Sequence, residues 1–367
     1  MIENERLHEL DSLRGIAAVG VIAWHYTNHF HASPFPRLMA PFYGHGLLLV
    51  DFFFVLSGFV LARTYWNDSR SSDFRSNLRD RIARIYPLHV ITLCAVALLQ
   101  WLLTHRLDSP PFVYAANDTR NFVLNLLLLN KSGLERGWSF NAPSWSISAE
   151  FIVNLAFLAT ITARKRIAAV TMAIACAISM AIVCRNGLIS NSSFMGLDND
   201  IFRAMLGFCI GVALQKLDAT ITEIRIHRMI YDAIAIASAA WFLYYCSSSD
   251  FSNKMDLIVA LIGFPALIIG SIRGSIIRQT LRIPPLVFLG TISYSLYLVH
   301  FPLQLVTHIV GVASGHDMPY ASRAFFVAFM LATIALSWVT YHVVEVPGKS
   351  AIKRITSRQS LTASRHG

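Results

Sequence analysis

Residues 11–26 read DSLRGIAAVGVIAWHY, and the interpretation of the whole chain starts from this segment. It is an apolar run long enough to begin a membrane span, yet it carries Arg14 near one end and His25 near the other. In a helix the two residues are about three turns and roughly 16 Å apart, so they share one face. Ionisable groups inside a bilayer are costly and are therefore functional candidates. The alternative is an Arg14 that reaches the membrane interface and a His25 that is simply packed.

The composition is that of a polytopic membrane protein. Of 367 residues, 55% are hydrophobic and 14% are charged, whereas soluble domains carry about 25% charged residues. The N-terminal residues are acidic and lack a basic n-region, so no cleaved signal peptide is expected. The five cysteines lie in apolar segments without a Cys-x-x-Cys pair, so neither a disulfide framework nor a metal site is predicted.

Windows of about 17 to 25 mostly apolar residues mark transmembrane helices. They predict an all-α, polytopic membrane helix bundle of about ten spans: 12–30, 46–66, 86–104, 145–163, 167–184, 200–216, 230–246, 256–272, 287–310 and 323–343.

The distribution of basic residues predicts the orientation of these spans. With both termini in the cytoplasm, 21 of the 31 Lys and Arg residues lie inside, eight lie outside and two lie within spans. This is the positive-inside bias of membrane proteins. It accounts for the net charge of +10, which in a soluble protein would suggest nucleic acid; no nucleic-acid partner is expected here.

Two loops are expected to carry structure. Residues 74–86 have an apolar stripe at helical spacing, with Ser72 or Asp73 as a plausible N-cap. We predict an amphipathic helix at the inner surface that ends at Pro87. On the outer side, residues 121–130 are apolar but too short to span, which indicates a re-entrant or interfacial segment.

Four ionisable residues fall at one predicted depth, about 10 Å below the outer surface when counted at about 1.5 Å per residue. They are His25, Asp51, Glu150 and His300, each from a different span. Because intramembrane charges usually face the bundle interior and pair with one another, we expect one cluster.

Further polar residues fit a lined cavity around that cluster. Ser146 and Ser148 precede Glu150, and Tyr297 lies one turn before His300. Arg203, in the sixth span, is either a side chain that reaches the interface or an acceptor contact. Gly207 and Gly211 form a Gly-x-x-x-Gly motif that indicates helix packing.

Six motifs in order resemble those of the acyltransferase-3 family of membrane acyltransferases. The first is Leu13-Arg14-Gly15 with His25 after ten intervening residues. The others are residues 50–59 (VDFFFVLSGF), 81–88 (RIARIYPL), 143–150 (PSWSISAE), 293–302 (SYSLYLVHFP) and 344–347 (VEVP). The match runs along most of the chain.

The resemblance implies transfer of an acyl group, most often acetyl, from cytoplasmic acyl-CoA to a hydroxyl group, commonly on a lipid-linked or exported sugar. Acetyl-CoA would be a donor substrate, with no permanently bound cofactor. In a bacterium this places the protein in the inner (plasma) membrane as a multi-pass enzyme. Residues 1–345 would form the transmembrane acyltransferase domain, and 346–367 a short basic cytoplasmic tail.

Acyl transfer needs a base for the hydroxyl proton, and His25 suits that role near neutral pH. Glu150 or Asp51 would orient it, and Tyr297 or a serine near 146 would donate to the developing oxyanion. Arg14, Arg81 and Arg84 are the candidates for the coenzyme phosphates, because guanidinium groups bind phosphate bidentately. Basic inner loops are also what topology alone requires.

A proton-coupled secondary transporter is the alternative function, because intramembrane His, Asp and Glu also serve proton relays. Such transporters often show repeated halves, and no internal repeat is evident in this sequence.

Overall fold

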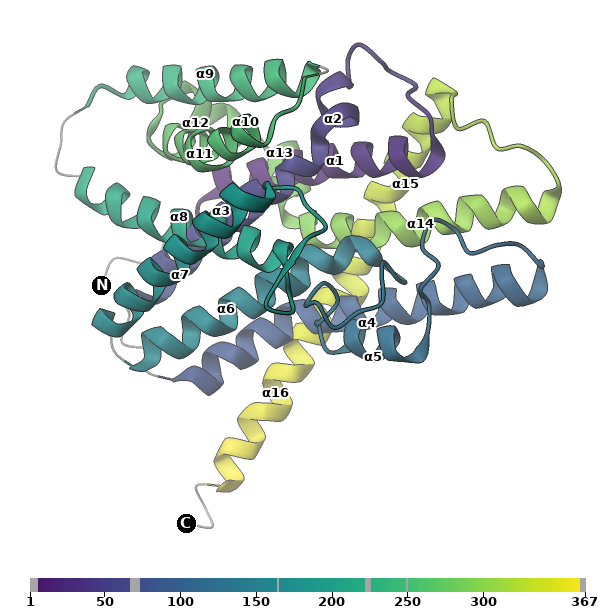
Figure 1. Cartoon of the computed structure of the whole chain (residues 1–367), viewed down its shortest axis with the longest axis horizontal. Helices are drawn as coiled ribbons and strands as arrows, with labels where there is room; N and C mark the ends of the chain where they lie inside the picture. Colours follow the sequence, from purple (N-terminus) through teal and green to yellow (C-terminus); the bar gives the residue numbers. More distant parts are fainter. Residues whose placement is uncertain (1–5, 67–72, 164, 222–225, 249, 364–367) are drawn as a thin grey trace.

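A computed structural model of the chain describes residues 6–66, 73–163, 165–221, 226–248 and 250–363. The described chain is almost entirely helical (Figure 1). The long helices are α1 (His8–Phe30), α3 (Leu49–Tyr65), α4 (Phe74–Arg106), α6 (Trp145–Ala163), α7 (Lys165–Asn186), α8 (Asn199–Ile221), α9 (Arg228–Ser247), α14 (Ser293–Ser314), α15 (Arg323–Thr340) and α16 (Val346–Ala363).

Shorter elements connect them. They are α2 (Ala40–His45), η1 (Gly46–Leu48), α5 (Thr119–Leu126), η3 (Ala142–Ser144), α10 (Asn253–Ile258), the π-helical turn η4 (Val259–Gly263), α11 (Phe264–Arg273), α12 (Ile276–Leu281), α13 (Pro284–Thr291) and the π-helical turn η5 (Tyr341–Glu345). The two-residue strands β1 (Ser193–Phe194) and β2 (Leu197–Asp198) form an antiparallel hairpin.

Eight helical segments within the described residues are long and apolar enough to cross a membrane. Each coincides with one of the predicted spans. The other two predicted spans, 12–30 and 200–216, correspond to α1 and α8, which are 23 residues each but more polar. Both pack against several other helices inside the bundle. The all-α polytopic bundle predicted from the sequence is therefore confirmed.

Close helix packing places α8 against α3. A Cβ added at Gly211 would collide with the carbonyl of Val55, and one added at Gly58 would collide with the carbonyl of Phe208. The interface therefore depends on glycine from both helices, as small-residue packing in membranes often does. The prediction that Gly207 and Gly211 serve packing is confirmed, since Gly207 faces Phe54 of α3.

Helix α1 is continuous through both Arg14 and His25, so the two residues do share a helix as predicted. Near its start α1 crosses α13, where Gly15 and Gly290 leave no room for a Cβ on either side. Ser12 donates a hydrogen bond of 2.5 Å to the Leu281 carbonyl, and buried Glu9 pairs with Arg282 at 2.9 Å. These contacts fix the height and rotation of α1 in the bundle.

The prediction that a surface helix ends at Pro87 is wrong. Asp73 does cap the helix, accepting from the Arg75 amide at 3.1 Å, whereas Ser72 lies outside the described residues. The helix then continues through Pro87 to Arg106, about 50 Å at about 1.5 Å per residue. A proline inside a membrane helix is tolerated when surrounding groups compensate for the lost backbone hydrogen bond. The amphipathic segment and the third span are therefore one rigid element.

The segment 121–130, predicted to be re-entrant or interfacial, overlaps α5, which is eight residues long and does not span. Its C-terminal end lies beside the middle of α4. His89 donates to the Asn125 carbonyl at 2.7 Å, and Tyr86 donates to the Leu126 carbonyl at 2.5 Å. The chain between α4 and α6 therefore folds back against the interior part of α4.

Segments assigned to the cytoplasm meet at one end of the bundle. Residues from the start of α1, the end of α3 and the start of α16 surround a common cavity. The expected basic tail begins as helix α16, which continues α15 through η5 and projects away from the bundle (Figure 1). Lys353 of α16 pairs with Asp80 of α4 at 2.9 Å. The domain boundary at residue 345 stays a prediction.

Candidate active site

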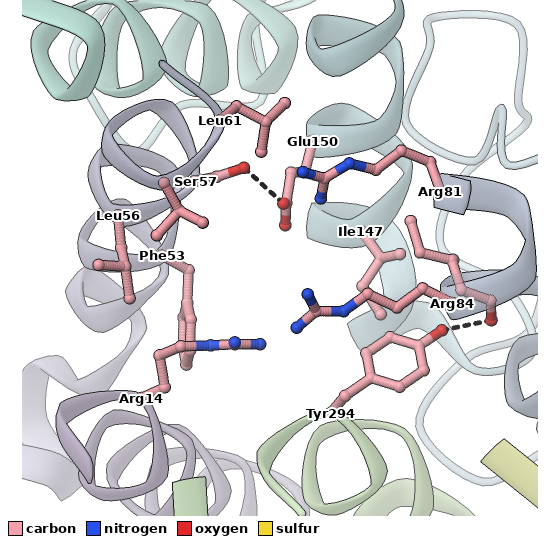
Figure 2. A pocket seen from close by; sticks show the side chains of 12 residues that line it. Arg14, Phe53, Leu56, Ser57, Leu61, Arg81, Arg84, Ile147, Glu150 and Tyr294 are labelled. Atoms are coloured by element: carbon pink, nitrogen blue, oxygen red, sulfur yellow. Dashed lines mark hydrogen bonds between the residues drawn. The ribbon is translucent and has the colours of Figure 1, made fainter. Parts of the chain in front are cut away.

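The three candidate donor-binding arginines lie in one pocket. Arg14 comes from α1, and Arg81 and Arg84 come from one face of α4. Figure 2 shows Arg14 and Arg84 pointing toward each other from opposite walls, with Arg81 directed toward Glu150 of α6. The grouping predicted from the sequence is thus present in space.

Positive charge dominates this pocket. Within the part of the chain that the structure describes, Arg81 and Arg84 form no ion pair within 4.0 Å, and Arg14 only approaches Asp11 at 3.9 Å. Glu150 is the single carboxylate of the lining, and it accepts a 2.6 Å hydrogen bond from Ser57 of α3 (Figure 2). Three guanidinium groups thus face one carboxylate, an arrangement suited to an anion with more than one negative charge.

Below this pocket a larger cavity of about 560 Å³ opens at the end of the bundle assigned to the cytoplasm. Arg14, Arg84 and Tyr294 line both spaces. Glu345 of η5 also lines it and accepts from Ser295 at 2.9 Å, so it forms part of the cavity wall. The basic residues of the lining are Arg6, Arg14, Arg63, Arg84 and Lys349.

In the other direction the arginine pocket of about 90 Å³ adjoins a narrower one of about 60 Å³. Arg14, Phe53 and Glu150 line both, and the narrower pocket adds Ser146 and Tyr297. The hydroxyl groups of Ser146 and Tyr297 are 2.7 Å apart. Three adjoining cavities therefore lead from the cytoplasmic end to Tyr297.

Two buried histidines lie immediately beyond Tyr297. The ring of His300 is 5.9 Å from that of Tyr297 and 4.9 Å from that of His25. The sequence-based prediction that His25 and His300 lie close together is confirmed. His25 is 3% exposed and His300 is fully buried.

Hydrogen bonding fixes which nitrogen of His25 is free. Its Nδ1 lies 3.0 Å from the Val21 carbonyl, which can only accept. Nδ1 therefore carries the hydrogen, and Nε2 is left as the acceptor that a general base needs. Among the described residues neither ring nitrogen of His300 has a hydrogen-bond partner. An unpartnered buried imidazole beside the candidate base indicates a place for a polar ligand atom.

Of the predicted cluster of two histidines and two carboxylates, the histidines are adjacent, Asp51 has another partner, and the position of Glu150 beside them stays a prediction. Asp51 is bound to Arg203 of α8 through two hydrogen bonds of 2.9 and 2.6 Å, and both side chains are nearly inaccessible. Glu150 faces Ser57 and the arginine pocket. In the described chain neither carboxylate is hydrogen-bonded to His25 or His300. A common depth did not reveal which way each side chain faces around its helix.

Two other predicted pocket residues also have structural partners. Ser148 donates to the Leu128 carbonyl of the loop before α6, and it lines none of the three cavities. Arg203 binds Asp51, approaches Asp200 at 3.6 Å and lies over the Trp145 ring. Both hold elements together at the outer half of the bundle.

Sequence reasoning missed Ser57 and His29. Ser57 lies within a quoted motif, but its type alone did not mark it. His29 follows His25 by one helical turn, and the ring centroids are 5.2 Å apart. This spacing of four residues was a usable signal. Among the described residues, no group of three His, Cys, Asp or Glu is arranged to hold a metal ion.

Comparison with known proteins adds an independent line of evidence. A family model described as an acyltransferase domain matches residues 7–342. The chain is 26% identical to acyltransferase MdmB of Streptomyces mycarofaciens, with 93% of this chain and 91% of that protein aligned. No solved structure matches the chain.

Two further relatives are named for O-acetylation. The putative peptidoglycan O-acetyltransferase YrhL of Bacillus subtilis is 23% identical, and O-acetyltransferase OatA of Staphylococcus aureus is 21% identical, each over 95% of this chain. This chain spans only 56% and 58% of their lengths. Because the family model covers nearly all of the helical bundle and its candidate site, the chain belongs to the acyltransferase-3 family and is an integral membrane O-acyltransferase.

Proposed function

We propose that this enzyme transfers a short acyl group, acetyl by preference, from cytoplasmic acyl-CoA to a hydroxyl group of a sugar in a cell-surface or exported glycan. The observation that carries the proposal is the series of three cavities that leads from a basic vestibule, the cavity of about 560 Å³ lined by Arg6, Arg63 and Lys349, to Tyr297. The Tyr297 ring lies 5.9 Å from that of His300, which in turn lies 4.9 Å from that of His25. A bacterial inner membrane is the compartment in which such a donor and such an acceptor would lie on opposite sides.

The donor would bind with its phosphates at Arg14, Arg81 and Arg84. These groups carry more positive charge than Glu150 offsets, and phosphate oxygens would supply the missing anions. The pocket of about 60 Å³ beyond is lined partly by Phe53 and Ile147, which suits a slender, mostly uncharged pantetheine arm. The thioester would then reach the region of Tyr297.

At the thioester, the acceptor hydroxyl oxygen attacks the carbonyl carbon while His25 Nε2 takes the hydroxyl proton. The new C–O bond forms as the C–S bond breaks, and the proton passes to the departing coenzyme A sulfur. Ser146 and Tyr297 share one hydrogen between them, so the other hydroxyl hydrogen is free to stabilise the oxyanion. His300 contributes a second unpartnered imidazole at the same place.

The names of two relatives support a sugar hydroxyl as the acceptor. Both are described as O-acetyltransferases, one putatively of peptidoglycan, which is a sugar polymer. The transporter alternative has no such support, since the family model and these relatives are acyltransferases.

The test is transfer of radiolabel by the purified protein in sealed liposomes. Acetyl-CoA labelled in the acetyl group is supplied on the side of the basic vestibule, and glycan extracted from cells that lack the gene is supplied on the other. We expect labelled glycan with wild-type protein and none with His25→Ala. Movement of free acetate or of the glycan itself, without a new ester, would instead identify a transporter.

A further inference from the structure

The loop between α4 and α5 packs against the residues that follow His25 on α1 and His300 on α14. Phe112 of this loop stacks on His308 with 4.6 Å between ring centroids. The Tyr114 ring lies 5.1 Å from Phe301 and 5.5 Å from His29. Tyr114 and His29 are partly exposed, whereas His25 and His300 beneath them are buried.

A polar chain links Tyr114 to the turn of α1 that follows His25. Nδ1 of His29 lies 2.8 Å from Gln304 Oε1, which only accepts, so Nδ1 carries the hydrogen. Nε2 of His29 therefore accepts the hydrogen bond of 3.0 Å from the Tyr114 hydroxyl. Burial raises the pKa of the Tyr114 phenol, so that hydroxyl keeps its proton and stays a donor. The Tyr114 hydroxyl is thus hydrogen-bonded to His29, which lies one helical turn after His25, the proposed general base.

The amide of Gln304 has spare hydrogen-bonding capacity at this place. Gln304 is fully buried, and its Nε2 has no hydrogen-bond partner among the described residues. A buried unpartnered donor is rare in native structures unless a ligand or a water satisfies it. His29 beside it already accepts a hydrogen bond from a hydroxyl group. The two groups together suit a polyhydroxyl ligand, in which one hydroxyl donates to His29 and a second oxygen accepts from the Gln304 amide.

A strained turn holds Tyr114 in position. The Tyr114 amide donates to the Phe112 carbonyl at 2.7 Å, and Val113 between them has φ of 60°. Positive φ is unfavourable for a β-branched residue, so the surroundings must impose this conformation. Gln100 fixes Phe112 through both backbone groups, at 2.9 and 3.1 Å. Relaxation of this turn would favour withdrawal of Tyr114.

We infer that His29 and Gln304 bind the sugar of the acceptor, and that the Tyr114 hydroxyl occupies the position of one sugar hydroxyl until the acceptor displaces it. This inference rests on the proposed function. Imidazole, amide and phenol carry no formal charge here, so the site suits a neutral sugar. Trp138, 37% exposed and 6.4 Å from the Tyr114 ring, adds an aromatic face at the rim. If one sugar hydroxyl binds His29, the adjacent hydroxyl of the same sugar ring can point toward His25, whose ring lies 5.2 Å from that of His29.

The kinetic test compares two variants that should act in opposite directions. Tyr114→Phe removes the competing hydroxyl, so we expect KM for the extracted glycan to fall at least threefold. His29→Gln removes the binding group, so we expect KM for the glycan to rise at least tenfold with acetyl-CoA affinity unchanged. A structural role alone would move both variants in the same direction, and that result would overturn the inference.

A chemical test needs no catalytic turnover. Diethyl pyrocarbonate modifies the unprotonated nitrogen of histidine, and peptide mass spectrometry gives the rate at His29. We expect that rate to rise at least fivefold in Tyr114→Phe and to stay at the wild-type value in Tyr320→Phe. Tyr320 is a matched control because it stacks on Phe30 of α1, 4.0 Å between centroids, rather than on His29. An unchanged rate in Tyr114→Phe would refute the inference even if transfer is confirmed. Absent transfer with the expected labelling would refute the proposed function, and with it the sugar as ligand, while the masking of His29 by Tyr114 would stand.

Discussion

The imidazole rings of His25 and His300 lie 4.9 Å apart and are inclined at 47°, which joins α1 to α14 at the centre of the candidate site. No carboxylate is hydrogen-bonded to either ring within the described chain. The pair therefore differs from a triad, in which a carboxylate stabilises the imidazolium. A proton taken up by His25 has no such partner, so it should pass promptly to the departing thiolate.

Replacement of His25 by alanine should lower acetyl transfer by a factor of about 10² to 10⁴, the usual contribution of a general base. His25→Gln keeps a polar side chain and should be as inactive. Transfer of label from acetyl-CoA to extracted glycan provides the measurement. His316→Gln, in an exposed turn after α14, is the control. Near-normal transfer by His25→Ala would remove His25 from the mechanism.

Arg81→Lys and Arg84→Lys should each weaken acetyl-CoA binding by roughly tenfold or more, because a hydrogen bond to a charged group contributes about 1.5–3 kcal/mol and lysine lacks the guanidinium fork. Calorimetric titration in detergent measures the affinity. Arg166→Lys is a matched control, since Arg166 is an exposed arginine of α7 that lines none of the three cavities. Equal affinity in all four proteins would leave these arginines with a topological role only.

Loss of either partner of the Asp51–Arg203 pair should destabilise the fold. Removing one member of a buried ion pair typically costs about 3–5 kcal/mol, because the other charge stays buried without its partner. Without Asp51, Arg203 would keep only Asp200, at 3.6 Å. We expect Asp51→Leu and Arg203→Leu each to lower the midpoint of thermal unfolding, and the double variant to be more stable than either. An Asp51→Leu protein with wild-type stability and no activity would instead restore Asp51 as a catalytic candidate.

Gly211→Val should prevent normal assembly of the bundle. The added Cβ would collide with the Val55 carbonyl, and backbone on both helices leaves little room to adjust. Gly263→Ala is the matched control, since its Cβ would lie an ordinary 3.5 Å from the Trp241 ring. The yield of monodisperse protein after detergent extraction separates the two. A monodisperse Gly211→Val protein at wild-type yield would show that α3 and α8 do not pack closely.

Much of the fold could be predicted from the sequence because a membrane span needs only a continuous run of about 20 apolar residues. Apolar length located the eight candidate membrane spans and the two more polar helices α1 and α8, and Gly-x-x-x-Gly correctly indicated packing at Gly207 and Gly211. The prediction at Pro87 was wrong because proline ends helices in water-soluble proteins but is tolerated within membrane helices. In α4 the helix continues through it, with the neighbouring Ile85 carbonyl accepting from Tyr294 at 2.6 Å.

The candidate site was harder to predict because depth is only one of its coordinates. Counting residues placed His25 and His300 together correctly, but it placed Asp51 with them when Asp51 faces Arg203. Rotation of a helix about its axis depends on contacts such as that of Ser12 with Leu281, which join residues distant in the chain. The grouping of Arg14 with Arg81 and Arg84 was predicted because charge and helical spacing coincide there.

Helix α1 can be regarded as a molecular ruler. It carries Arg14 at the proposed donor pocket and His25 at the proposed point of transfer on one uninterrupted helix, about 16 Å apart at about 1.5 Å per residue. A donor whose phosphates bind at Arg14 must therefore have its thioester at a distance that matches the separation of Arg14 and His25 along α1. One residue inserted between them would turn Arg14 by about 100° relative to His25, since a helix has about 3.6 residues per turn. Such an insertion should abolish transfer even when both side chains are retained, so the reaction depends on the number of residues between Arg14 and His25 as well as on their identity.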